Sequence, residues 1–183
     1  MIRLLDIFFS IFGLFFLLPL FSLISLIGFF NKGSPFFLQK RVGLNLKIFT
    51  LVKFRTMKLD TISVGTHLVD LSNVTRFGYF LRKFKLDEIP QLWNVLIGNM
   101  SLVGPRPCLL NQKRLINERR KRGVFKVRPG ITGSAQVLGL TMEKPKLLAK
   151  TDLKMIKKMN LFYYFYYILM TIFIIFKRIC KLC

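Results

Sequence analysis

The chain of 183 residues carries 30 lysine and arginine residues against 8 aspartate and glutamate residues, and its formal net charge is +22. This length fits one domain with membrane-facing elements, but a hydrophobic content of 52% is too high for an ordinary soluble domain and the charge is too high for a simple membrane anchor. The combination favours a protein that lies against an anionic surface or binds a phosphate-rich substrate. Nucleic acid is the competing explanation for the charge. It is not the expected partner, because the basic residues are spread along the chain without a recognised nucleic-acid motif.

The first predicted element is the apolar segment of residues 7–30, which carries no charge over 24 residues. As a straight helix it would be about 36 Å long, which is enough to cross a bilayer. Pro19 lies near its midpoint, flanked by Ser22 and Ser25, and predicts a bend because proline removes a backbone hydrogen bond. Geometry alone favours a kinked helix that crosses the membrane. A sharper bend would instead leave two limbs of about 18 Å that enter and leave the same leaflet.

A cationic body follows this segment, and the positive-inside tendency keeps such a body cytoplasmic in either case. It opens with two predicted short strands, residues 36–39 and residues 47–54, which form a β-hairpin. Turns and loops are predicted by glycine, proline and polar residues at 31–35, 43–45 and 60–72. The last of these contains the single histidine, His67, to which the pattern assigns no role.

Two helices are predicted next, over residues 75–84 and from residue 87 to about 97, where Gly98-Asn99 ends the second one. If Asp87 is the N-cap of the second helix, Pro90 occupies its third position. The missing N–H of proline has no intrahelical partner to lose at that position.

Asp87 and Glu88 stand side by side in a chain that has only 8 acidic residues. Adjacent carboxylates repel each other, so their pairing between Lys85 and Pro90 points to chemistry that uses carboxylates: a nucleophile, a base or a Mg²⁺ ligand. The alternative is an exposed first helical turn, where acidic residues interact favourably with the helix dipole. At a helix N-terminus the pair would also lie where free N–H groups attract phosphate.

Two stiff loops, residues 101–107 and 127–133, each hold one arginine beside a proline, Arg106 and Arg128. A guanidinium on a pre-ordered backbone suits bidentate phosphate binding, although any basic chain contains some arginines beside prolines. A basic helix is predicted between the loops, over residues 111–122.

Residues 160–176 form the last predicted element, which is apolar and rich in tyrosine and phenylalanine. Lysine and arginine bracket it at both ends, so an interfacial helix fits better than a crossing one; a buried core helix is the alternative. The cysteines at 108, 180 and 183 are odd in number and are interpreted as free thiols.

Five segments make the chain similar to a known family. In order after the proline-broken N-terminus they are residues 39–43 (QKRVG), 53–57 (KFRTM), 86–96 (LDEIPQLWNVL), 100–107 (MSLVGPRP) and 127–133 (VRPGITG). With these motifs the chain resembles the monotopic polyprenol-phosphate phosphoglycosyl transferases, the bacterial sugar transferase family, in a minimal single-domain form. The resemblance extends from about residue 4 to residue 171.

The resemblance implies transfer of a sugar phosphate from a nucleotide diphosphate sugar to a polyprenol phosphate, with undecaprenyl phosphate the expected acceptor, at the start of surface glycan synthesis. By the family pattern Asp87 is the covalent nucleophile and Glu88 assists as a base or Mg²⁺ neighbour, so both are expected near the metal. Arg82, Arg106 and Arg128 are the expected phosphate-binding residues. The rival hypotheses are a catalytically silent membrane scaffold and a membrane-tethered nucleic-acid binder, and self-association is left open.

The resemblance also implies a re-entrant N-terminal helix broken at Pro19, which reverses the preference for a crossing helix. The expected fold is α+β and mostly helical: a monotopic membrane protein with this re-entrant helix, a short β-hairpin and interfacial amphipathic helices. Its parts are a membrane helix at 1–31, a cytoplasmic catalytic domain at 32–159 and an aromatic C-terminal segment at 160–183, on the cytoplasmic face of the bacterial inner membrane. The chain departs from the usual family residues at five positions: Leu18, Lys85, Asn99, Ser134 and Tyr164.

Overall fold

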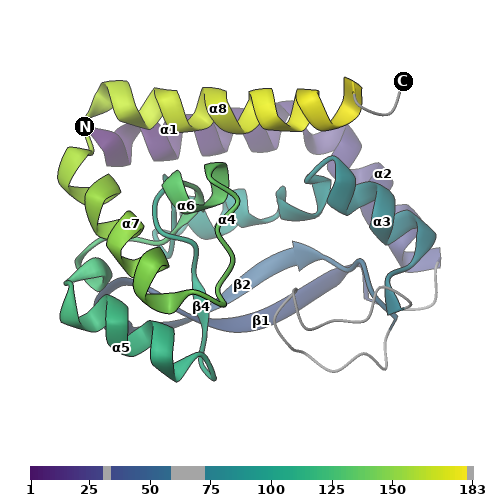
Figure 1. Cartoon of the computed structure of the whole chain (residues 1–183). Coiled ribbons are helices and arrows are strands. Elements are labelled where there is room, and N and C mark those ends of the chain that lie inside the picture. The colour runs from purple at the N-terminus through teal and green to yellow at the C-terminus, as the bar shows by residue number, and fades with distance from the viewer. Residues whose placement is uncertain (31–33, 59–72, 181–183) are drawn as a thin grey trace.

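The computed structural model describes residues 1–30, 34–58 and 73–180, and within them the chain is a mostly helical α+β protein, as predicted. The predicted loop at 60–72 with His67, most of the turn at 31–35 and Cys183 lie outside the described residues. Figure 1 shows two long helices along one side of the molecule, with the hairpin on the opposite side and shorter helices between them.

The predicted hairpin is confirmed. Strand β1 (Phe36–Val42) pairs antiparallel with β2 (Ile48–Phe54), so that Phe36 lies opposite Phe54 and Val42 opposite Ile48. The connection, η1 (Leu44–Leu46), is a short 3₁₀ turn, and Gly43 N donates to Lys47 O at 2.8 Å to close it. Strand β1 extends three residues beyond the prediction, because residues 40–42 continue the pairing with β2. A third strand, β4 (Cys108–Leu109), pairs with the last two of these residues.

The two Arg-Pro loops were predicted without regular structure, and this was wrong in part. Strand β3 (Ser101–Val103) in the first loop pairs in parallel with β5 (Gly130–Thr132) in the second. The pairing depends on glycine: a Cβ on Gly130 would lie 2.0 Å from the backbone nitrogen of Gly104. The backbone contact therefore holds the two loops together.

At the N-terminus, α1 (Ile2–Phe16) and α2 (Leu18–Phe30) are bent by 63° at Leu17. The bend lies two residues before Pro19, because proline is accommodated in the first turn of α2, and its ring is incompatible with a continuous helix through the preceding turn. Among the described residues no single helix is long and apolar enough for a membrane crossing, and α1 and α2 meet those criteria only as a bent pair.

Helix α1 is fixed to the body by polar side chains. Arg3 donates to Val95 O at 2.7 Å and to Leu96 O at 2.9 Å. The Asp6 carboxylate is buried and accepts from Ser101 Oγ at 3.0 Å, from Leu102 N at 3.0 Å and from Tyr164 Oη at 2.9 Å. These bonds join the first helix, the first Arg-Pro loop and the last helix.

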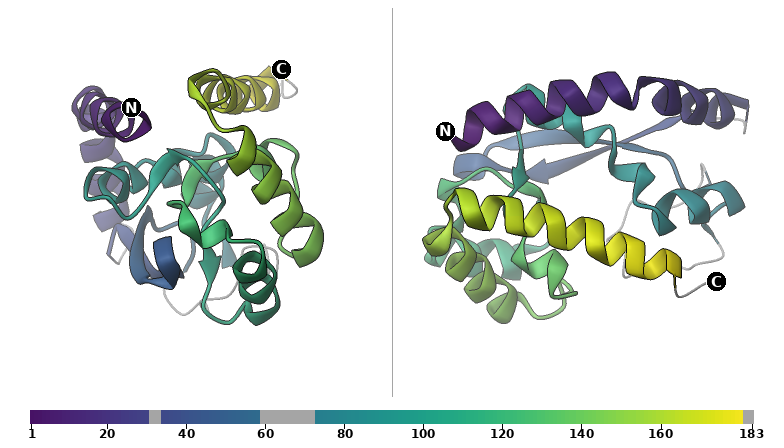
Figure 2. Two further views of the ribbon diagram at one scale, coloured as in Figure 1. Left: turned by 90° about the vertical axis from the view of Figure 1, so that its left-hand side faces the viewer. Right: turned by 90° about the horizontal axis from the view of Figure 1, so that it is seen from above.

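That last helix, α8 (Leu161–Cys180), confirms the predicted C-terminal element and runs beside α1 (Figures 1 and 2). The Phe9 and Phe165 rings meet edge to face, with centroids 6.1 Å apart. One side of α8 is buried at Tyr164, whereas Phe162 and Phe173 are 72% and 60% exposed. The helix is therefore neither wholly buried nor wholly exposed.

The remaining helices lie between the loops of the cationic body. Helix α3 (Arg76–Lys83) confirms the helix predicted at 75–84, with Thr75 as its N-cap, and α5 (Lys113–Lys121) lies within the predicted basic helix. The sequence did not predict α6 (Ser134–Val137) or α7 (Pro145–Lys158).

The helix predicted from Asp87 begins later than expected. Residues Leu86–Glu88 form a 3₁₀ turn, η4, and α4 (Gln91–Leu96) follows with Pro90 as its N-cap. Asp87 is therefore not the N-cap, and the third helical position that this condition gave to Pro90 does not apply. The end of α4 was predicted correctly: Gly98 adopts φ 89° and Asn99 N donates back to Asn94 O at 3.0 Å.

Candidate active site

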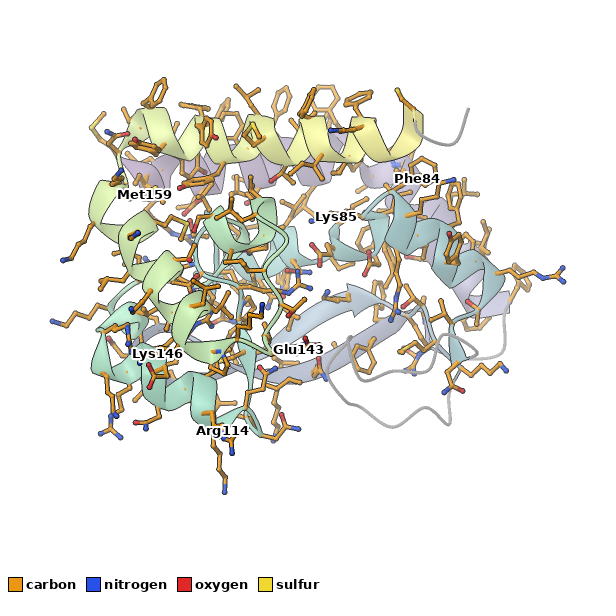
Figure 3. All side chains as sticks on the ribbon, viewed as in Figure 1. Phe84, Lys85, Arg114, Glu143, Lys146 and Met159 are labelled. Atoms are coloured by element: carbon orange, nitrogen blue, oxygen red, sulfur yellow. The ribbon has the colours of Figure 1, made fainter. Side chains whose placement is uncertain are left out.

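The acid pair lies in the short turn between α3 and α4. Lys85, the residue before this turn, adopts a left-handed conformation with φ 55°, which is uncommon for a residue with a side chain and turns the chain sharply. Figure 3 shows Phe84 and Lys85 at the C-terminal end of α3. Lys85 is also one of the five positions at which the chain departs from the usual family residues.

Glu88 is held by two cations that come from different parts of the chain. Lys53 Nζ, at the end of β2, lies 3.0 Å from Glu88 Oε1, and Arg106 Nη2, in the first Arg-Pro loop, lies 3.4 Å from the same oxygen. Burial alone would raise the pKa of Glu88, but Lys53 and Arg106, with a smaller contribution from Lys85, lower it to about 2. Glu88 is therefore ionised throughout the physiological range.

Asp87, the neighbouring residue, shifts in the opposite direction. Its side chain is buried, and burial raises its pKa above the ordinary value. The positive charge of Lys53 opposes this rise, and the negative charge of Glu88 adds to it. Arg82 and Arg106 also oppose the rise, with smaller effects. Two adjacent carboxyl groups whose environments move their pKa values apart are typical of groups with different chemical roles.

Two of the predicted site residues, Arg82 and Arg106, thus lie around this turn together with Lys53. Arg82 lies on α3 and donates through Nε to Thr56 Oγ1 at 2.8 Å, which fixes its guanidinium near Asp87. Arg106 contacts the turn through Glu88. The arrangement places cationic groups around two carboxylates, as needed for binding a diphosphate close to an anionic nucleophile.

The position of Lys53 depends on a buried asparagine. Asn94 on α4 accepts from Val52 N at 3.0 Å and donates to Thr50 O at 2.8 Å. Its side-chain amide therefore pairs with the edge of β2 as a neighbouring strand would. Since Lys53 is the next residue in β2 and the acid pair directly precedes α4, this contact sets the distance between Lys53 and Glu88.

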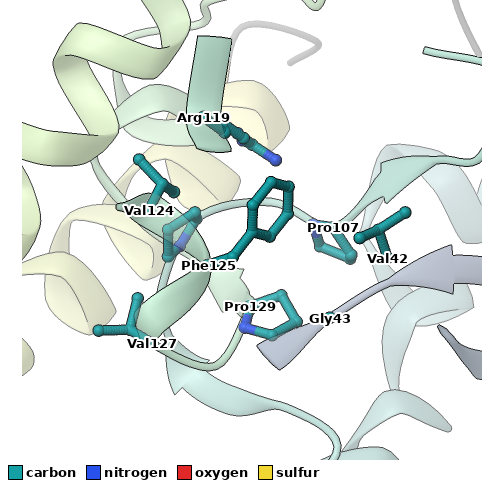
Figure 4. A pocket seen from close by; sticks show the side chains of 9 residues that line it. Val42, Gly43, Pro107, Arg119, Val124, Phe125, Val127 and Pro129 are labelled. Carbon is teal, nitrogen blue, oxygen red and sulfur yellow. The ribbon is translucent and has the colours of Figure 1, made fainter. Parts of the chain in front are cut away.

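The backbone that carries Arg106 is held by a second buried group. Arg119 on α5 donates through Nη1 to Arg106 O at 2.7 Å and through Nε to Asp152 Oδ2 at 2.9 Å. Arg119 also lines a small pocket with Phe125 and with Pro107 and Pro129, the prolines of the two Arg-Pro loops (Figure 4). Both loops thus pack around one centre.

Arg128, the third predicted phosphate-binding residue, lies away from the acid pair. Its Nε donates to Gly98 O at 2.8 Å, next to the carbonyl groups that Arg3 binds at the end of α4. Its predicted contact with substrate phosphate stays a prediction.

The carboxyl oxygens fit a divalent cation that is shared with substrate. Within the described residues there is no group of three or more histidine, cysteine or acidic side chains that could form an all-protein metal site. Among the hydrogen bonds between described residues, none is accepted by the Asp87 carboxylate or by Glu88 Oε2. Mg²⁺ is commonly held by one or two carboxylates together with substrate phosphates, and these oxygens provide that set.

Lys53, Asn94 and Arg119 were not among the site residues predicted from sequence. Lys53 belongs to the KFRTM segment and Asn94 to the segment of the acid pair, so the motifs contained both residues without indicating what they contact. Arg119 lies outside all five motifs, and only its position in the fold connects it to the site. The described cysteines, Cys108 and Cys180, are free thiols, as predicted.

Comparison with known proteins gives a consistent result. A family model described as bacterial sugar transferase matches residues 1–178. The chain is 51% identical over 108 residues to the uncharacterized sugar transferase EpsL of Bacillus subtilis, covering 58% of this chain and 53% of that protein. It is 44% identical over 126 residues to UDP-glucose:undecaprenyl-phosphate glucose-1-phosphate transferase of Xanthomonas campestris, covering 64% of this chain and 25% of that protein.

A third relative matches over most of both chains. The exopolysaccharide production protein PSS of Rhizobium leguminosarum is 38% identical over 149 residues, covering 75% of this chain and 74% of that protein. By contrast, the chain spans only about half of the length of the Bacillus relative and about a quarter of the length of the Xanthomonas relative.

Proposed function

The chain belongs to the bacterial sugar transferase family, and we propose that it transfers a sugar phosphate from a nucleotide diphosphate sugar to a polyprenol phosphate. The observation that carries this proposal is the acid pair itself: Glu88 is held ionised by Lys53 and Arg106, while Asp87 is buried beside them with a raised pKa. The name of the Xanthomonas relative describes a reaction of this type with glucose 1-phosphate and undecaprenyl phosphate.

In the proposed first step, an oxygen of the Asp87 carboxylate attacks the phosphorus that bears the sugar. The bond from that phosphorus to the bridging oxygen breaks, and the nucleoside monophosphate leaves with the electron pair of the bond. The product on the enzyme is an aspartyl phosphosugar. In the second step, a phosphate oxygen of the polyprenol phosphate attacks the same phosphorus, and the Asp87 carboxylate is regenerated as the leaving group.

The surrounding residues act on charge and position. Arg82 and Arg106 neutralise the diphosphate as it approaches the acid pair, and Lys53 keeps Glu88 ionised and oriented. Bound Mg²⁺, held by Asp87 and Glu88 together with the substrate, would offset negative charge on the phosphates. Glu88 is placed to orient this ion or to accept a proton.

The reaction needs access to a membrane lipid, and we propose that α1 and α2 supply it as a re-entrant element that enters and leaves the cytoplasmic leaflet of the inner membrane. The 63° bend and the exposed apolar side chains on both helices support this arrangement. The outer side of α8 carries exposed aromatic residues next to α1 (Figure 3), so α8 would lie in the same interface.

Product analysis tests this proposal directly. Membranes that contain the protein are incubated with labelled nucleotide sugars and a polyprenol phosphate, and the soluble products are separated by chromatography. Nucleoside monophosphate is the expected product. A nucleoside diphosphate would indicate ordinary glycosyl transfer and overturn the proposal, and the absence of turnover with every sugar in the panel would favour a silent scaffold.

A further inference from the structure

A second cationic site lies at the N-terminal end of α1, apart from the acid pair. A cavity of about 330 Å³ opens between this end of α1, the C-terminal end of α7 and the second Arg-Pro loop. Met159, at the end of α7, lies below the start of α8 (Figure 3). The cavity walls contain three basic side chains, Arg3, Lys126 and Arg128, and one acidic side chain, Asp6.

The charge in this cavity favours an anion. The Asp6 carboxylate is buried and accepts three hydrogen bonds through one oxygen, from Ser101, Leu102 and Tyr164, so it is already stabilised by the protein. In the described part of the chain no carboxylate pairs with Arg3, Lys126 or Arg128. The basic side chains therefore outnumber the acidic one and lack acidic partners.

Two of these cations are held in place before any ligand arrives. Arg3 binds the carbonyl groups of Val95 and Leu96, and Arg128 binds that of Gly98, so both guanidinium groups are anchored to the end of α4. Each guanidinium has five N–H donors, and these contacts leave several of them for a ligand. Anchoring lowers the entropy lost on binding and suits bidentate contact with phosphate oxygens.

The rest of the cavity indicates what kind of molecule carries the phosphate. Its other walls are largely apolar and include Ile2, Met155 and Met159. The same end of α1 also exposes apolar side chains that do not line the cavity, Leu4 at 71% and Phe8 at 58%. A soluble phosphate would gain nothing from these surfaces, whereas the hydrocarbon chains of a lipid would cover them.

From this juxtaposition we propose that the cavity binds the phosphate headgroup of a membrane lipid between Arg3, Lys126 and Arg128, with the hydrocarbon chains along α1. This site is additional to the acid pair, and the inference does not depend on the proposed transfer reaction. Because Arg3 and Arg128 also hold the end of α4, a bound lipid would strengthen the connection between α1 and the helix that follows the acid pair.

Native mass spectrometry of the full chain in detergent tests the site by counting retained lipid. Phosphatidylglycerol and phosphatidylcholine are added in turn, and we expect one phosphatidylglycerol to be retained in preference. Lys126→Gln removes an exposed charge in the cavity and should weaken this binding about fivefold. Met159→Trp fills the cavity without changing the charge and should weaken it as well. Lys154→Gln, an equal charge change on the exposed side of α7, should have no effect.

Competition identifies the source of the phosphate. Displacement of phosphatidylglycerol by a polyprenyl monophosphate would support the site, and the tighter of the two lipids would be its preferred occupant. Displacement by millimolar inorganic phosphate would show a small-anion site and overturn the assignment to a lipid. Equal weakening by Lys126→Gln and Lys154→Gln would show general attraction to the cationic surface and overturn the site itself.

Discussion

Replacement of Lys53 by methionine tests how the acid pair is held. Lys53 and Arg106 lower the pKa of the largely buried Glu88 from 4.5 to about 2, a difference that corresponds to about 3 kcal/mol in favour of the ionised form. Methionine keeps most of the apolar volume and removes the charge at 3.0 Å, while Arg106 remains at 3.4 Å. We expect the free energy of unfolding at pH 7 to fall by about 2 kcal/mol, less than for a buried pair that is broken completely.

The pH dependence gives the same prediction a second measure. The folded pKa of Glu88 lies below its ordinary value, so its contribution to stability is fully present above pH 4.5 and is lost as the pH falls through about 2. The free energy of unfolding of the wild-type protein should fall across this range. The fall should be smaller for Lys53→Met, because ionised Glu88 stabilises the variant less at neutral pH. Because Lys53 also lowers the pKa of Asp87, the acid limb of transfer activity should move to higher pH in the variant.

Guanidinium unfolding in detergent micelles provides the measurement, followed by the fluorescence of Trp93, the single tryptophan. A chelator keeps divalent cations from competing for Glu88. Lys47→Met, an identical exchange at an exposed position beside β2, is the control and should change stability little. Equal stability of the Lys53 variant and wild type at pH 7, together with unchanged pH profiles, would refute the assignment of Lys53 as the main partner of Glu88.

Three further predictions concern the nucleophile, the α1 contact and the bend. Asp87→Asn removes the anionic attacking oxygen, so turnover of labelled nucleotide sugar should fall by several orders of magnitude; activity within about tenfold of wild type would exclude the covalent role. Tyr164→Phe deletes a donor to the buried Asp6 carboxylate and should cost about 1–3 kcal/mol in thermal or chemical unfolding, whereas an unchanged stability would show that Ser101 and Leu102 suffice. Pro19→Ala should allow a more continuous apolar helix. A single cysteine placed near Met1, in a background without native cysteines, should then be labelled from outside intact cells. Labelling from the inner face alone would show that Pro19 does not set the topology.

The sequence predicted the elements that have a local pattern. The hairpin, α3 and α8 have alternating or continuous apolar residues over a sufficient length. Strand β1 was predicted three residues too short, because its end contains Arg41, a charged residue that is nevertheless buried and donates to Pro107 O at 3.2 Å. Burial and the neighbouring guanidinium group of Arg106 lower the pKa of Arg41 to about 10, so Arg41 is still cationic at neutral pH. A buried arginine does not resemble a strand residue in the sequence.

What the sequence could not provide was contact between distant segments. Strands β3 and β5 are three residues each and pair because Gly104 and Gly130 allow a close backbone approach, a feature without periodicity. The acid pair was identifiable because acidic residues are rare in this chain. Lys53 was not identified, since it lies 35 residues from Glu88 and nothing in its own neighbourhood indicates that contact. For α7 the signal was present: Pro145 marks its start, and its buried residues recur at helical spacing.

Helix α4 explains how a membrane-facing helix and a catalytic turn depend on each other. It has only six residues, too few to be stable alone. Four separate parts of the chain fix it: the acid pair turn at its start, β2 through Asn94 in its middle, and Arg3 of α1 and Arg128 of the second Arg-Pro loop at its end. A change in the tilt of α1 must therefore either move α4 or break the two hydrogen bonds from Arg3, at 2.7 Å and 2.9 Å. Since α4 also sets the distance from Lys53 to Glu88, the orientation of α1 bears on the electrostatics of the acid pair. The bent N-terminal segment is in this sense part of the support of the proposed active site and not only its attachment to the membrane.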